Sequence, residues 1–167
     1  MNNEIPSITI RLAVPADAPD MAQIHMRSWE AAYSYFIPSE YIKEKNAKRP
    51  ELWKRIINDE NNTNYVILIK NKIVGIMSVV PTPQDADADC NTCELEGIYL
   101  HPDYYRMGIG TKALDYAFEI ARKWNKTAIT LWVLADNTNS IKFYYKCGFT
   151  PDGKEKVLKL WKTAHGD

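Results

Sequence analysis

Residues 95–114 read LEGIYLHPDYYRMGIGTKAL and hold the most informative pattern in the chain. An apolar segment leads into a polar turn, and a long helical pattern begins at Gly110. Gly108 and Gly110 allow a ligand to approach the main chain closely, because they carry no Cβ. Free amides at a helix start attract anions, and Arg106 adds a cation nearby. The turn therefore predicts a diphosphate site, although a tight strand-to-helix turn without any ligand explains the same glycines.

The segments on either side of this pattern alternate between strand and helix character. The order is early helices, an antiparallel run, and then strand, helix, strand, helix and strand, which is typical of a mixed α/β or α+β fold with helices on both faces of one sheet. We expect strands at 8–12, 65–69, 73–80, 94–100, 128–133 and 157–161, and a hairpin turn at Asn71 and Lys72. We expect helices from Asp17 or Pro19, a short one from Ser39, and others at 51–57, 110–124 and 139–146.

A second pattern lies at residues 137–149, NTNSIKFYYKCGF. It is similar to motif B of the GNAT superfamily of N-acetyltransferases, Asn-x-x-Ala-x-x-Phe-Tyr-x-x-x-Gly-Phe, with Ser140 in place of the alanine. The first pattern resembles motif A of the same family, Gln/Arg-x-x-Gly-x-Gly/Ala. Tyr105 stands where the family prefers Gln or Arg, and Arg106 where it often has Gly.

This resemblance implies acetyl-CoA as co-substrate and a central, mostly antiparallel sheet of six to seven strands flanked by four to five helices. The strands at 94–100 and 128–133 are then expected to diverge, with acetyl-CoA between them. The residues that the resemblance assigns to acetyl-CoA are Ile98, Tyr99, Leu100, Tyr105, Arg106, Met107, Gly108, Ile109, Gly110, Thr111, Asn137, Ser140, Phe143 and Tyr144.

Acetyl transfer to an amine needs a base for the amine proton and an acid for the leaving thiolate. The resemblance gives the acid to Tyr144, whose alternative role is an aromatic packing under the ligand. For the base, Glu96 ranks before Glu94, because both project from one face of a strand and the family often has an acid at the Glu96 position. The alternative is that both glutamates are solvated charges.

The aromatic residues of the first helices are either core or part of the acceptor site. Trp29, Tyr33 and Phe36 resemble a pattern of small-molecule acetyltransferases, so we expect them at the acceptor. The function expected is transfer of an acetyl group to a primary amine of a small molecule, in a ternary complex. Acetylation of a protein N-terminus or lysine, and a non-catalytic acyl-CoA-binding sensor, remain open.

The composition sets further expectations for a single domain spanning residues 1–167. Because 21 basic residues balance 21 acidic ones, nucleic acid is not the expected partner. No apolar run is long enough for a membrane span, and the N-terminus does not resemble a signal peptide, so the cytoplasm is expected. Cys90 and Cys93 form a C-x-x-C without further metal ligands at the right spacing, so no metal site is expected. The sequence is compatible with a homodimer.

Overall fold

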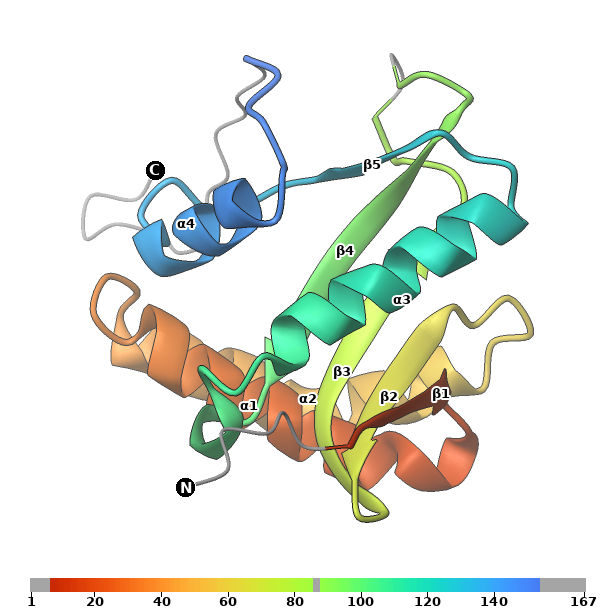
Figure 1. The fold of residues 1–167 in the computed structure, drawn as a ribbon. Coiled ribbons are helices and arrows are strands. Elements are labelled where there is room, and N and C mark those ends of the chain that lie inside the picture. Colours follow the sequence, from red (N-terminus) through yellow and green to blue (C-terminus); the bar gives the residue numbers. More distant parts are fainter. Residues whose placement is uncertain (1–6, 86–87, 154–167) are drawn as a thin grey trace.

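The computed structural model describes residues 7–85 and 88–153, which form one sheet with helices on both faces (Figure 1). The expected mixed α/β fold is confirmed. The strands are β1 (Thr9–Leu12), β2 (Asn64–Ile69), β3 (Lys72–Val80), β4 (Thr92–Leu100) and β5 (Ala128–Leu131). The helices are α1 (Ala18–Tyr33), α2 (Ser39–Ile57), α3 (Ile109–Lys123) and α4 (Thr138–Lys146), with short 3₁₀ turns η1 (Pro15–Asp17) and η2 (Pro102–Tyr104).

The five strands lie in the order β1-β2-β3-β4-β5. Neighbours are antiparallel except β4 and β5, which are parallel because α3 carries the chain back between them. Within the described residues the sheet thus has five strands, and the expectation of six to seven is wrong. The strand expected at 157–161 lies outside the described residues.

Two hydrophobic cores hold the layers together. One lies between α3 and the sheet and includes Met77, Leu95 and Leu114. The other lies between the first two helices and the opposite face of the sheet, and includes Met21 and Trp53. The candidate active site lies beside the last residues of β4, between these two layers.

The second helix corrects one expectation. Two helical pieces were expected around Pro50, but α2 runs unbroken through this proline. Its buried residues recur three or four positions apart, at Ile42, Asn46, Arg49, Trp53 and Ile57. This continuous buried stripe packs against α1 and the sheet, and such packing outweighs the hydrogen bond that a proline removes.

The hairpin between β2 and β3 also differs by one residue from the expectation. Its turn residues are Lys70 and Asn71, with φ of 51° and 64°, while Lys72 already pairs with Ile69. Two successive positive φ values define the type I′ turn that matches the twist of a two-residue hairpin.

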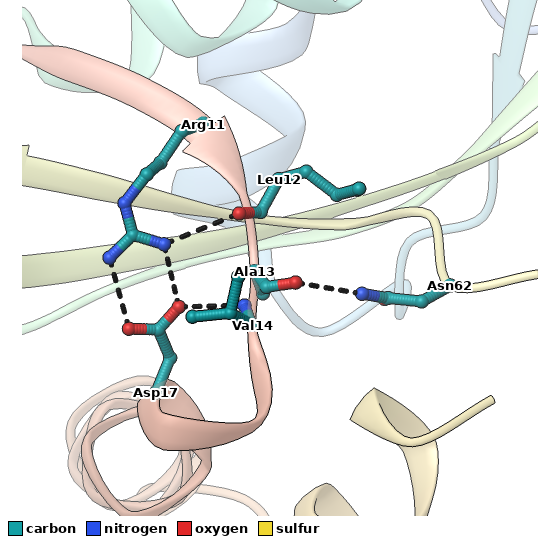
Figure 2. Close-up of polar contacts among 6 residues, drawn as sticks. All are labelled: Arg11, Leu12, Ala13, Val14, Asp17 and Asn62. Atoms are coloured by element: carbon teal, nitrogen blue, oxygen red, sulfur yellow. Dashed lines mark hydrogen bonds and ion pairs between the residues drawn. The ribbon is translucent and has the colours of Figure 1, made fainter. Parts of the chain in front are cut away.

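A polar cluster fastens β1 to the start of α1 (Figure 2). Arg11 donates two hydrogen bonds to Asp17, of 2.7 and 3.0 Å, and the Val14 amide donates a third of 2.8 Å. The Asn62 side chain donates to the Ala13 carbonyl at 3.1 Å, which connects the segment before β2. Because Asp17 is buried, its carboxylate depends on these donors.

Candidate active site

The turn before α3 presents main-chain amides at the start of a long helix. Gly108 precedes α3 with a left-handed φ of 77°, and Arg106 has a φ of 61°. Residues with a Cβ are strained in that region, so the backbone conformation alone explains why position 108 is glycine. The first amides of a helix lack partners within it, and Tyr105, Arg106, Met107 and Thr111 around them are exposed. The turn therefore has the geometry of an anion site, and bound diphosphate stays a prediction.

Gly110 has a different reason to be glycine. A Cβ at this position would lie 3.0 Å from Cζ of Phe143, so α4 packs directly against the first turn of α3. Ile109 between the glycines is buried in the α3 core, so only its main chain is available to a ligand. The two sequence motifs are thus joined by a contact of Phe143, which lies beside the helix start.

The strands β4 and β5 pair over only four residues. Their pairing runs from Thr92 with Ala128 to Leu95 with Leu131, while β4 continues to Leu100. β5 ends at Leu131, two residues before the expected end, so β4 continues beyond Leu95 without it, and the chain leads from β5 into α4 (Figure 1). Among the described residues no strand pairs with the 96–100 main chain on this side, so its polar groups there are available to a ligand.

The register of β4 breaks at Glu96. Ser78 pairs with Gly97 and Val79 with Leu95, which leaves Glu96 as the extra residue of a β-bulge. Leu95 packs in the α3 core, so Glu96 and Gly97 project together toward α1 and α2. Glu96 is exposed and accepts a hydrogen bond from Ser78 Oγ at 3.1 Å. Glu94, two residues earlier, is only 7% exposed. The two candidate bases therefore differ sharply in access to solvent.

Phenol side chains from three elements gather around this part of β4. Burial raises the pKa of Tyr144 on α4 above its ordinary value, and the nearby hydroxyls of Tyr99 and Tyr33 raise it further. Burial also raises the pKa of Tyr33 to about 12, with Tyr99 again contributing. Each phenol thus stays protonated at neutral pH, and each can donate a hydrogen bond. The structure brings the predicted acid, Tyr144, next to Tyr33 of the predicted acceptor side.

The predicted ligand contacts at the start of α4 have structural roles. Asn137 is buried and its side-chain oxygen accepts from the Ser140 amide at 3.3 Å, which caps the helix. The same side chain lies close enough to Tyr33 to oppose the rise of its pKa. Asn137 therefore orients α4, and with it Tyr144, toward α1.

The three aromatic residues expected at the acceptor form one chain of edge-to-face contacts. The ring centroids of Trp29 and Tyr33 are 4.9 Å apart, and those of Tyr33 and Phe36 are 5.6 Å apart. The Trp29 ring is also covered by the Arg49 guanidinium, 4.3 Å from its centroid. All three rings are half-buried, so each keeps some surface that an acceptor can contact.

Sequence reasoning missed a buried polar cluster behind Tyr99. It consists of His25 on α1 and Arg49 and Trp53 on α2, and both Trp53 Nε1 and Arg49 Nη1 reach His25 Nδ1, at 3.1 and 3.3 Å. No sequence motif marks His25 or Arg49. The only signal was the helical spacing of Arg49 and Trp53, which places both on one face.

Residues 7–85 and 88–153 hold neither a metal-binding cluster nor a membrane-spanning helix. No group of three or more His, Cys, Asp or Glu side chains in residues 7–85 and 88–153 is arranged to hold a metal ion. No helix in the same part of the chain is long and apolar enough to cross a membrane. Cys93 is buried and Cys90 is exposed, and both are free thiols.

Comparison with known families identifies the fold and its chemistry. Residues 19–149 match the model of the acetyltransferase (GNAT) family. The chain belongs to the GNAT family. Membership confirms the resemblance seen in the two motifs and the expected class of enzyme, an acetyl-CoA-dependent N-acetyltransferase.

Individual relatives cover most of this GNAT chain. A spermidine N(1)-acetyltransferase of Thermoplasma acidophilum is 26% identical over 163 residues, 92% of this chain and 96% of that protein. An uncharacterized N-acetyltransferase of Methanocaldococcus jannaschii is 26% identical over 168 residues, 95% of this chain but 66% of that protein. The crystal structure of the PaiA N-acetyltransferase from T. acidophilum in complex with coenzyme A has a TM-score of 0.76 at 24% identity, and covers 89% of this chain and 93% of that one.

Proposed function

We propose that this GNAT chain transfers the acetyl group of acetyl-CoA to the primary amine of a small molecule, by direct attack in a ternary complex. The observation that carries the proposal is that Tyr144, Tyr33 and the bulged Glu96 each lie near Tyr99, on the part of β4 that β5 leaves unpaired. An acid, an acceptor wall and a base then lie around one stretch of main chain.

The donor side is supported by main-chain groups. The amides that follow Gly108 at the start of α3 would hold the diphosphate of acetyl-CoA, with Arg106 as the neighbouring cation. The free edge of β4 at Ile98–Leu100 would pair with the pantetheine arm, and an amide there would polarise the thioester carbonyl. The PaiA structure shares this fold and contains bound coenzyme A, which supports the proposal that this chain binds acetyl-CoA.

Tyr144 is proposed to assist the leaving sulfur. Its raised pKa keeps the phenol protonated throughout the neutral range, so the hydroxyl is a hydrogen-bond donor at all working pH values. Donation to the sulfur as its charge develops lowers the barrier to C–S cleavage.

Glu96 is proposed as the base that takes the amine proton. An alkyl amine with a pKa near 10.4 is almost entirely protonated at pH 7, so attack requires a proton acceptor. Exposed Glu96 can exchange its proton with solvent after each turnover, whereas Glu94 is buried. The hydrogen bond from Ser78 fixes one oxygen of Glu96 and leaves the other available.

The acceptor is proposed to be a small amine because Tyr33 and Phe36 present an aromatic wall, and because a relative over nearly the whole chain is a spermidine N(1)-acetyltransferase. The test measures thiol release from acetyl-CoA with spermidine, simple alkyl amines, and peptides with a free N-terminus or an internal lysine. Turnover of small amines above peptides is expected. Faster turnover of peptides would show that the acceptor is a protein N-terminus or lysine instead of a small amine. Binding of acetyl-CoA without any thiol release would indicate a non-catalytic sensor.

A further inference from the structure

The Tyr99 side chain is held in one position over the main chain of β4. A Cβ on Gly97 would lie 2.9 Å from Cε2 of Tyr99 and 3.2 Å from its hydroxyl oxygen, so the ring extends back over this glycine. The ring also stacks on His25, with centroids 4.4 Å apart and planes 31° apart. Contacts with Gly97 and His25 therefore fix where the hydroxyl points.

The Tyr99 hydroxyl lies near enough to Glu96 for the carboxylate charge to raise the pKa of the phenol. Glu96 and Gly97 both project toward α1 and α2, on the same face as Tyr99. Gly97 follows Glu96 directly and has no side chain, so no Gly97 atoms beyond the main chain lie between Glu96 and the Tyr99 oxygen. Ser78 Oγ on β3 donates to the carboxylate at 3.1 Å, which fixes one oxygen of the base and leaves the other open to a further donor.

A buried cation lies behind the phenol. Arg49 is 5% exposed, its Nε donates to Asn46 at 3.1 Å, and its guanidinium covers Trp29. Arg49 contacts Asn46, His25 and Trp29, none of which is negatively charged. Arg49 and the Trp29 indole N–H both favour negative charge on the Tyr99 oxygen. With donors on this side, the Tyr99 O–H has reason to point away from them, toward Glu96 and the acceptor.

We propose that Tyr99 is a catalytic residue that relays the acceptor's proton to Glu96. This rests on the proposed function. An N–H bond of the bound ammonium breaks and its proton goes to the Tyr99 oxygen, while the Tyr99 O–H breaks and its proton goes to the Glu96 carboxylate. Tyr99 ends neutral, Glu96 ends protonated, and the nitrogen lone pair is free to attack the thioester. Arg49, His25 and Trp29 are positioning residues that set the place and polarity of the phenol.

The charge states of the surrounding groups are compatible with this relay. The groups that face Tyr99 are His25 and Tyr33 from α1, Arg49 from α2, Glu96 from β4 and Tyr144 from α4. Burial, followed by the nearby Arg49 charge, lowers the pKa of His25 to about 3, so His25 is neutral in any assay above pH 5. Burial raises the pKa of Tyr99, so this phenol enters the reaction with its proton.

The test compares Tyr99→Phe with the wild type in kcat/KM from pH 7 to pH 10, using spermidine or the panel amine that reacts fastest. Phenylalanine keeps the stacked ring and removes only the hydroxyl. We expect a loss of about 10- to 100-fold at pH 7, in the lower range of acid–base effects because water can replace the relay in part. The loss should shrink to about threefold near pH 10, where solvent already supplies free amine.

Two matched variants serve as controls. Tyr65→Phe removes a half-buried phenol that packs beside Tyr116 and the α3 core, and it should leave kcat/KM unchanged at every pH. Arg49→Lys, which keeps the charge, should retain more activity than Arg49→Met. A Tyr99→Phe loss that is the same at all pH values, or no loss, would overturn the relay while leaving the proposed function intact. A wild-type protein that acetylates no amine would overturn both.

Discussion

Gly97→Ala tests the close contact between β4 and Tyr99 most directly. The new methyl would lie 2.9, 3.1 and 3.2 Å from three atoms of the Tyr99 side chain, all inside ordinary contact, and His25 stacks on the same ring. Overpacking of this kind costs about 1–3 kcal/mol, while replacing a strand glycine returns about 0.5–1 kcal/mol of backbone entropy. The expected net destabilisation is about 1–2 kcal/mol, or a fall in Tm of about 2–8 °C for a chain of this size.

A double-mutant cycle separates the contact from the backbone effect. In a Tyr99→Ala background the methyl meets no ring, so Gly97→Ala should change sign and stabilise by about 0.5–1 kcal/mol. Gly97 has no positive φ, so alanine fits its backbone. Urea unfolding of the four proteins measures the coupling. An equal cost of Gly97→Ala in both backgrounds would refute the contact as the reason for the glycine.

The other predictions concern ligand binding, chemistry and stability. Gly108→Val should weaken acetyl-CoA binding about tenfold or more by calorimetry, since valine is strained at a φ of 77°, and an unchanged affinity would remove the turn from the site. Tyr144→Phe should lower kcat by about 10- to 1,000-fold without pH rescue and with little change in acetyl-CoA affinity, so wild-type kcat would leave Tyr144 a packing role. Glu96→Gln should lower kcat/KM about 100-fold at pH 7 and recover toward pH 10, with a much smaller effect of Glu94→Gln, and the reverse ranking would move the base. Asp17→Asn should cost about 1–3 kcal/mol of unfolding free energy at pH 7. The Arg11 hydrogen bonds lower the pKa of Asp17, so this stabilisation is present above the ordinary carboxyl pKa and is lost as pH falls through the lowered pKa. The difference in unfolding free energy between wild type and Asp17→Asn should therefore vanish in acid. A difference unchanged down to pH 2 would contradict that account.

Local patterns predicted the parts of the fold that depend on local physics. The apolar spacing along α3 and the glycine before it were readable, because helix faces and left-handed turns impose strict residue choices. The two short motifs also marked segments that meet in the fold, where Phe143 contacts Gly110. Whether those residues act as predicted depends on the experiments above.

Features that depend on long-range packing were not readable. The sequence around Arg49, KEKNAKRPEL, is mostly polar and holds four cations, and nothing in it marks one of them as buried against Trp29. The sequence indicated a short helix from Ser39 and a separate one at 51–57, but buried residues on either side of Pro50 keep α2 continuous. The bulge at Glu96 depends on how β3 and β4 align, which alternation within one strand does not reveal.

The bulge in β4 has an evolutionary consequence. Most single-residue deletions in a strand move every later side chain to the opposite face. Deletion of Glu96 would instead turn the bulge into a regular ladder, in which Leu95, Gly97 and Tyr99 keep their present partners on β3. The loss of one codon would thus remove the proposed base and leave both cores in place. Along this strand, a catalyst and a folded binding protein without catalysis are one genetic step apart.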